Sequence, residues 1–245
     1  MRSYAIGDIH GHLGLLKQAH AWIDADRARV GDAEAPVIHL GDLVDRGPDS
    51  RGVIEMLLAG QNAGKPWIVL RGNHDTMLAI FPDGGRDPSL REGLDYLHYK
   101  IGGVTTLESY GVDCSEKRAV EDIQADARQK IPAAHLKFLL NAPLFYLRGE
   151  VLFVHAGVRP QVALDQQTES DLTWIRGPFH EYHGPHPWLV VHGHTPLTAP
   201  THYGNRVNID SGAAFGGPLT ALVMEGREAY VLGPNGRTAL LPEPN

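Results

Sequence analysis

The chain has 245 residues, of which 42% are hydrophobic and 21% are charged, which is typical of a soluble globular protein. Its net charge of -7 and the lack of a basic stripe in the sequence argue against nucleic acid as a partner. The single cysteine, Cys114, excludes an internal disulfide. No apolar run is long enough for a membrane span, and the first residues turn polar too soon for a signal peptide, so we expect a cytoplasmic protein with no membrane partner.

The chain opens with repeated units of an apolar strand, a polar loop and a helix. Short apolar runs at Tyr4–Ile6, Pro36–Leu40 and Trp67–Leu70 predict three buried strands. Helically spaced apolar residues follow the first two runs, and each run ends in a polar cluster that contains glycine. This order predicts a parallel sheet with helices on its faces, in which a ligand would lie beyond the carboxyl ends of the strands.

The second polar cluster, Gly41–Gly47, contains two carboxylates and one guanidinium. Carboxylates this close together repel each other unless a cation lies between them. This pattern favours a metal ligand at Asp42 and an anion-binding side chain at Arg46. The alternative is an aspartate-rich turn that caps a helix beginning near Ser50.

Residues 82–145 have a different, helical pattern. Apolar spacing predicts helices around residues 90–101 and 104–110, a polar helix within 115–130 and a short helix within 132–141. We interpret residues 82–145 as a helical insertion that flanks the site within a single domain spanning residues 1–245.

The last third of the chain returns to strands. The apolar runs Glu150–Val154 and Trp188–Val191 predict buried strands, and histidines follow each of them. Runs at 207–209, 220–224 and 229–232 predict a series of antiparallel strands.

Five of the predicted strands end in residues that commonly bind metals. These candidate ligands are Asp8, His10, Asp42, Asn73, His155 and His194. Their mixture of carboxylate, amide and imidazole groups suits manganese, iron or zinc better than calcium or magnesium, and we expect manganese. Six ligands would saturate one ion, whereas two divalent or trivalent ions that share Asp42 would keep open positions for water and substrate.

Five motifs in this order resemble the phosphoprotein phosphatase family of dinuclear metallophosphoesterases. They are Gly7–Gly11, Gly41–Gly47, Gly72–Asp75, His155–Gly157 and Gly193–Thr195. The likeness is greatest to the small bacterial and phage branch of that family, whose C-terminal segment residues 208–217 also resemble. The resemblance implies an α/β, calcineurin-like metallophosphoesterase fold: a β-sandwich with helices on its outer faces.

The resemblance also implies how the ligands divide between the two metals. Asp8 and His10 would hold the first metal, and Asp42 would bridge to the second. The second metal would be completed by Asn73, His155 and His194. A hydroxide bridging the two ions would attack the phosphorus atom in line.

Phosphoester hydrolysis also needs groups for the phosphate and the leaving oxygen. Arg46 is the first candidate to bind the phosphate oxygens and Arg176 the second, although Arg176 could also be an arginine on a helix surface. His74 follows the ligand Asn73 directly and suits a general acid, with Asp45 orienting its imidazole. The resembled family assigns these tasks to the matching residues.

We expect a hydrolase, and its substrate class separates three hypotheses. The first is a phosphomonoesterase that acts on phosphoserine or phosphothreonine in proteins, with phosphotyrosine also open. The second is a dinucleoside polyphosphate hydrolase, whose diadenosine tetraphosphate-cleaving members share the motif ending at Asp75 and the Gly216–Thr220 ending but have alanine in place of Asp45. The third is an inactive metal-binding scaffold. Asp45 favours the first hypothesis, because a poor leaving group needs a general acid.

Two further features bear on partners. Asp75 replaces the glutamate found in eukaryotic members, so the resemblance implies no regulatory subunit. His180, His183 and His186 lie in a loop rich in proline and glycine, which could be a lid over the substrate, although we favour a solvated surface loop.

Overall fold

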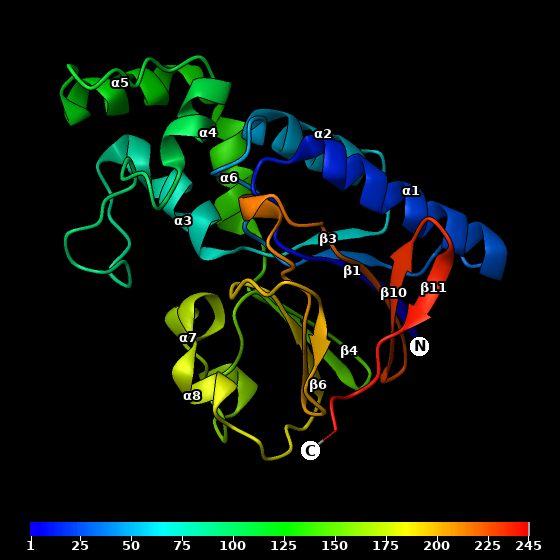
Figure 1. Cartoon of the computed structure of the whole chain (residues 1–245). Coiled ribbons are helices and arrows are strands. Elements are labelled where there is room, and N and C mark those ends of the chain that lie inside the picture. Colours follow the sequence, from blue (N-terminus) through cyan, green and yellow to red (C-terminus); the bar gives the residue numbers. More distant parts are fainter. Residues whose placement is uncertain (245) are drawn as a thin grey trace.

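Two β-sheets lie against each other in the computed structural model, which describes residues 1–244 (Figure 1). The first sheet has the strand order β11 (Gly236–Ala239), β10 (Glu228–Gly233), β9 (Ala221–Glu225), β1 (Arg2–Ile6), β2 (Val37–His39) and β3 (Trp67–Val69). The second has the order β4 (Phe145–Arg148), β5 (Val151–Val154), β6 (Leu189–His192), β8 (Arg206–Asn208) and β7 (Thr201–His202). The strands β1, β2 and β3 pair in parallel, as the opening units of the chain predict.

Each sheet separates two apolar layers because neighbouring side chains of a strand point to opposite faces. In β1, Ala5 packs in the core between the two sheets, whereas Tyr4 and Ile6 pack under the helices. In β5, Phe153 points into the core between the sheets and Leu152 away from it.

Helices cover both outer faces of the sandwich (Figure 1). Over the first sheet these are α1 (Leu13–Val30), α2 (Ser50–Asn62) and α3 (Asn73–Ile80), and beside the second are α7 (Glu169–Trp174) and α8 (Gly177–His180). Short 3-10 turns lie at η1 (Phe81–Asp83), η2 (Leu164–Gln166) and η3 (Ala213–Phe215). The sequence-based prediction of a β-sandwich with helices on its outer faces is therefore confirmed.

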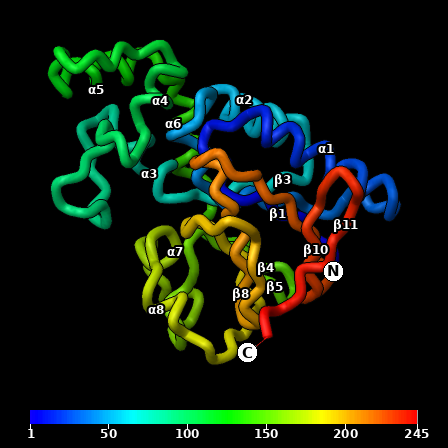
Figure 2. The backbone as a smooth tube through the Cα atoms, viewed as in Figure 1, coloured from blue at the N-terminus to red at the C-terminus, as the bar shows by residue number. Residues whose placement is uncertain are grey.

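The segment between α3 and the second sheet contains three helices, α4 (Gly103–Ser109), α5 (Val120–Lys130) and α6 (Ala133–Asn141). The helix expected around residues 90–101 is wrong: residues 84–102 form turns and loops, which Figure 2 shows beside α3 and below α5. Pro88 and several glycines interrupt a helix there, and the Arg86 guanidinium donates to the carbonyls of Leu90 and Arg91. That residues 82–145 are an insertion in one domain stays a prediction.

The strands near the end of the chain divide between the two sheets. β9 and β10 are antiparallel strands of the first sheet, as expected, but β8 belongs to the second sheet and runs parallel to β6. The prediction of one antiparallel series is wrong at this strand, because a short apolar run does not reveal its partner. None of the helices formed by residues 1–244 is both long and apolar enough to cross a bilayer.

Candidate metal centre

The candidate ligands meet where five strands end, between the carboxyl edges of the two sheets. Two groups of side chains have ligand atoms within 4.8 Å of one another, and Asp42 belongs to both. One group contains His10, Asp42 and His74, and the other contains Asp42, His155 and His194. Asp42 follows β2, the strand between β1 and β3, which gives its carboxylate access to both sides of the site.

The second group is arranged so that lone pairs converge. The Nδ1 atom of His155 lies 3.0 Å from the Leu40 carbonyl, to which it donates, so its Nε2 atom carries no proton. That Nε2 atom lies 3.0 Å from Oδ1 of Asn73 and 3.3 Å from Oδ1 of Asp42. The Nδ1 atom of His194 is 3.2 Å away from it. Electron-pair donors that face one another in this way suit a bound cation.

In the first group a backbone carbonyl orients His10 in the same way. Its Nδ1 atom donates to the Val44 carbonyl at 2.8 Å, which turns the unprotonated Nε2 atom toward Oδ2 of Asp42 at 3.5 Å. Asp8 lies outside both compact groups: its Oδ2 accepts the His194 backbone N–H at 2.9 Å. Its other oxygen, Oδ1, is buried and has no hydrogen-bond partner within residues 1–244.

The electrostatics of this site fit positive ions. Burial lowers the pKa of His10, His155 and His194, so these imidazoles are neutral and offer lone pairs at pH 7. Burial and the neighbouring carboxylates of Asp210 and Asp42 raise the pKa of Asp8 well above its ordinary value. Divalent ions would remove this repulsion between carboxylates and would give a partner to the buried Oδ1 atom of Asp8.

The backbone around the site is tight and strained. A side chain at Gly72 would place its Cβ 2.2 Å from Oδ1 of Asp42, and one at Gly193 would place its Cβ 1.9 Å from Oδ1 of Asp8. Among residues 1–244, six residues other than glycine have a positive φ, and five of them are predicted site residues. These five are His10, Asp42, Asp45, Arg46 and His194. Such costly conformations cluster where function fixes the backbone.

The two predicted phosphate-binding arginines line one cavity of about 370 Å³ together with Asp42, Asn73, His74 and His194. The guanidinium of Arg46 lies 3.0 Å from Nε2 of His10 and 3.2 Å from Nε2 of His74. It also lies over the exposed ring of Phe215, 5.0 Å from the ring centroid. Arg176, which precedes α8, is exposed and faces the same cavity.

A family model described as calcineurin-like phosphoesterase matches residues 1–220. The chain belongs to this family. It is therefore a phosphoesterase, a hydrolase from a family that uses a dinuclear metal centre. The resemblance read from the five motifs is confirmed, whereas the individual role of each site residue stays a prediction.

Curated relatives of this calcineurin-like phosphoesterase match most of its length. A protein of Anoxybacillus flavithermus named bis(5'-nucleosyl)-tetraphosphatase PrpE (asymmetrical) is 29% identical over 237 residues, covering 89% of this chain and 88% of the relative. A Bacillus mycoides protein of the same name is 28% identical over 246 residues, covering 91% and 90%. Among solved structures, a cold-active protein-tyrosine phosphatase of a psychrophilic Shewanella has a TM-score of 0.60 at 16% identity, covering 98% and 80% of the chains. That likeness bears on the fold alone.

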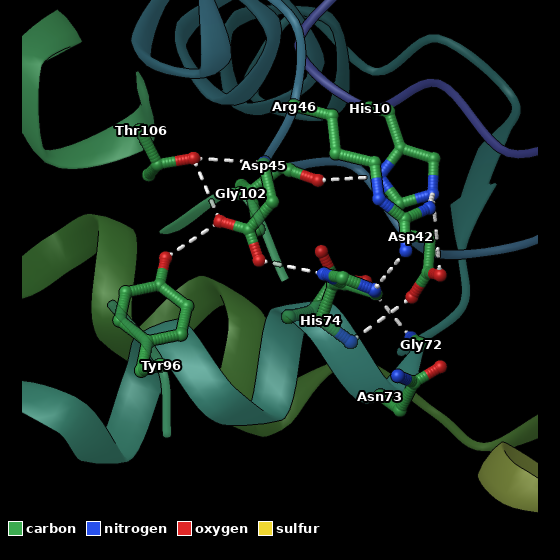
Figure 3. Close-up of polar contacts among 12 residues, drawn as sticks. His10, Asp42, Asp45, Arg46, Gly72, Asn73, His74, Tyr96, Gly102 and Thr106 are labelled. Atoms are coloured by element: carbon green, nitrogen blue, oxygen red, sulfur yellow. Dashed lines mark hydrogen bonds and ion pairs between the residues drawn. The ribbon is translucent and has the colours of Figure 1, made fainter. Parts of the chain in front are cut away.

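A buried network around Asp45 orients the predicted general acid of the phosphoesterase (Figure 3). Oδ2 of Asp45 accepts from Nδ1 of His74 at 2.7 Å, while Oδ1 accepts from the Tyr96 hydroxyl at 2.6 Å and the Thr106 hydroxyl at 2.8 Å. The pairing of Asp45 with His74 follows the sequence-based expectation. Tyr96 and Thr106 were not expected, because they lie 51 and 61 residues from Asp45 in the chain and carry no motif.

Asp75 is a third residue whose role the sequence did not indicate. Its Oδ1 accepts the Leu43 backbone N–H at 2.9 Å, and its Oδ2 accepts the Gly72 backbone N–H at 2.8 Å. The buried carboxylate therefore joins the start of α3 to the loop that carries Asp42. It therefore fixes the backbone that presents the candidate ligands Asp42 and Asn73.

Three other histidines lie outside the cavity of the candidate metal centre. His192 is fully buried at the end of β6, where its ring packs edge-on against Phe179 at 5.0 Å between centroids. His180 and His186 also pack around Phe179. None of these three lines the cavity that contains Asp42 and Arg46.

Proposed function

We propose that this phosphoesterase hydrolyses dinucleoside polyphosphates, cleaving a bis(5'-nucleosyl) tetraphosphate asymmetrically into a nucleoside triphosphate and a nucleoside monophosphate. The relatives that match about nine-tenths of the chain carry this activity in their names. These names support hydrolysis of dinucleoside polyphosphates, the second sequence-based hypothesis, more strongly than hydrolysis of phosphoproteins, the first.

The observation that carries this proposal is the position of Phe215. Its ring is 68% exposed at the cavity that holds the candidate ligands, and the Arg46 guanidinium lies beside it. A nucleotide offers a flat base next to a phosphate, and an exposed aromatic ring next to a guanidinium is a matching surface. A phosphoserine side chain offers no such flat group.

The residues present fit two metal ions. Asp8, His10 and Asp42 would hold one ion, and Asp42, Asn73, His155 and His194 the other, with manganese the metal we expect from this donor set. When bound, the ions supply Lewis-acid activation of water and neutralise the charge on phosphate oxygens.

The side chains of the chain would then divide the remaining tasks. Arg46 and Arg176 would bind oxygens of the phosphate under attack, which requires the Arg46 guanidinium to turn from the imidazoles of His10 and His74 toward the substrate. Once Arg46 has turned, Nε2 of His74 is free to carry a proton to the leaving oxygen. Asp45 would keep Nδ1 of His74 protonated and the ring in place.

A second candidate function is hydrolysis of phosphomonoesters, with phosphoprotein as substrate. The observation that favours it is the complete Asp45–His74 pair, with 2.7 Å between Oδ2 and Nδ1. A serine alkoxide is a far poorer leaving group than a nucleotide phosphate, so a buried, oriented general acid contributes most on such substrates.

A direct comparison of substrates tests the proposal. We expect the manganese-loaded protein to have a higher kcat/KM on diadenosine tetraphosphate than on a phosphoserine peptide or p-nitrophenyl phosphate, and to release ATP and AMP in equal amounts. Release of ADP alone would contradict asymmetric cleavage, and a higher kcat/KM on the phosphopeptide would favour the second candidate.

A Phe215→Ala variant tests the base-binding surface. Stacking of a base on an aromatic side chain contributes ~1–3 kcal/mol, so KM for diadenosine tetraphosphate should rise about tenfold. The change on p-nitrophenyl phosphate should be much smaller, and Phe215→Tyr, which keeps the ring, should restore the wild-type KM.

A further inference from the structure

The cavity that holds the candidate metal ligands contains more positive charge than one phosphate needs. Its lining includes four cationic side chains, Arg46, Arg91, Lys100 and Arg176, and only one acidic side chain, Asp42. None of the four cations has a carboxylate within 4.0 Å among residues 1–244. In a chain whose net charge is -7, this concentration of unpaired cations indicates an anionic ligand with several charges.

The four cations come from different parts of the fold. Arg46 and Arg176 are the predicted phosphate-binding residues, whereas Arg91 and Lys100 belong to the turns of residues 84–102. Arg91 and Lys100 are exposed, so their charges meet the solvent until a ligand enters. Hydrolysis of a single phosphate ester gives these two side chains no task.

The turns that carry Arg91 and Lys100 are fixed against the site. The Gly102 carbonyl accepts the Arg46 backbone N–H at 3.1 Å, two residues after Lys100 (Figure 3). The Tyr96 hydroxyl donates to Asp45 at 2.6 Å in the middle of the segment. A segment held in this way can present its charges without a large loss of conformational entropy on binding.

Two hydrogen bonds also fix the start of this segment. Oδ2 of Asp87 accepts from the indole nitrogen of Trp174 at 3.0 Å, which joins residues 84–102 to α7. The Arg86 guanidinium donates to the backbone carbonyl of Arg91 at 3.0 Å and holds that turn in place. Trp174, Arg91 and Lys100 all line the cavity, and these hydrogen bonds fix the backbone that carries them.

We propose that Arg91 and Lys100 bind the phosphates that lie beyond the phosphate under attack, so that the cavity selects an oligophosphate chain over a phosphate monoester. This inference rests on the proposed hydrolysis of dinucleoside polyphosphates and names the residues that give it specificity. A chain of four phosphates carries about four negative charges at neutral pH, enough to engage a second pair of cations after Arg46 and Arg176 are used.

Inhibition by inorganic anions tests the proposal without any nucleotide. The probes are tripolyphosphate and orthophosphate, measured as inhibitors of p-nitrophenyl phosphate hydrolysis at constant free manganese. Arg91→Ala and Lys100→Ala should each raise the tripolyphosphate inhibition constant about five- to tenfold, because each removes a charge-assisted hydrogen bond at an exposed position. The orthophosphate constant should rise less than about twofold.

The double variant and a matched control complete the experiment. The Arg91→Ala/Lys100→Ala protein should lose about 30-fold or more in tripolyphosphate binding, with a similar rise in KM for diadenosine tetraphosphate and little change in its kcat. Lys17→Ala, which removes an exposed lysine of α1, should leave both inhibition constants unchanged.

The outcomes separate this proposal from the proposed function. An equal loss for tripolyphosphate and orthophosphate, or no loss for either, would overturn the assignment of Arg91 and Lys100 even if diadenosine tetraphosphate is hydrolysed. A selective loss for tripolyphosphate in a protein that does not cleave diadenosine tetraphosphate would support the assignment and overturn the proposed function.

Discussion

The metal-ligand groups and residues 84–102 line the same cavity, but different forces hold them in place. The candidate ligands follow buried strands, and the backbone packs so closely there that a side chain at Gly72 would clash with the Asp42 carboxylate. Residues 84–102 have no regular secondary structure, and side chains such as Arg86, Asp87 and Tyr96 hold them.

This difference suggests separate tasks for the two regions: the candidate ligands serve the hydrolysis itself, and residues 84–102 serve the choice of substrate. Where the backbone itself positions a side chain, a change of residue type strains the sheet edge, so the ligand groups tolerate little variation. Where side-chain hydrogen bonds position a loop, charges on that loop can change while the loop keeps its shape. We expect substitutions of the candidate metal ligands to abolish hydrolysis and substitutions of Arg91 and Lys100 to alter the choice of substrate.

The largest effect is expected at the carboxylate shared by both ligand groups. Asp42→Asn should lower the metal content from two ions per chain and reduce hydrolysis of every substrate to the level of the blank, because an amide cannot neutralise two cations. Elemental analysis and steady-state rates measure this. Asp83→Asn, at a carboxylate exposed on the surface, is the control. Two retained ions with normal rates would remove Asp42 from the centre.

The next effect concerns the predicted general acid. His74→Asn should reduce kcat on an alkyl phosphate by ~10²–10⁴-fold, which is the usual contribution of general acid catalysis, while the metal content stays near two ions. The loss should be smaller on p-nitrophenyl phosphate, whose leaving group needs less protonation. An unchanged rate on the alkyl phosphate would exclude this role for His74.

A smaller effect is expected where residues 84–102 touch the catalytic pair. Tyr96→Phe removes the hydroxyl that donates to Oδ1 of Asp45 but keeps the buried ring. We expect kcat to fall about tenfold, with KM and metal content unchanged, because Asp45 would hold the His74 imidazole less firmly. Tyr110→Phe, which removes a buried hydroxyl bonded to His135, is the matched control. A change in KM alone would assign Tyr96 to substrate binding.

The smallest effect is expected at the loop rich in histidine. Deletion of residues 181–185 should leave kcat and KM on p-nitrophenyl phosphate unchanged, because none of these residues lines the cavity that contains Asp42 and Arg46. Circular dichroism should first establish that the shortened protein is folded. A large rise in KM would indicate that the loop acts as a lid over the substrate.

The ligand groups could be predicted because they depend on one geometric rule. Parallel strands end at the same edge of a sheet, so residues that follow β1, β2 and β3 must lie close together, and Asp42 could be placed between its neighbours. His155 and His194 follow β5 and β6, which also pair in parallel, so the same rule applies to the second sheet.

The conformation and contacts of residues 84–102 could not be predicted, for two physical reasons. Leu90, Leu94 and Ile101 have helical spacing, but they enter the core from turns whose carbonyls are satisfied by the Arg86 side chain rather than by helix hydrogen bonds. Contacts such as that of Tyr96 with Asp45 join residues far apart in the chain, and no local pattern encodes them.

The division of the ligands between two sheets also affects the order of events during synthesis. The candidate ligands of the first ion, Asp8, His10 and Asp42, are all present once the chain has passed β2 and its following loop. The second ion also needs His194, which follows β6 in the second sheet. A nascent chain can therefore assemble one half of the centre long before the other, and the second ion can be acquired only after the two sheets have docked.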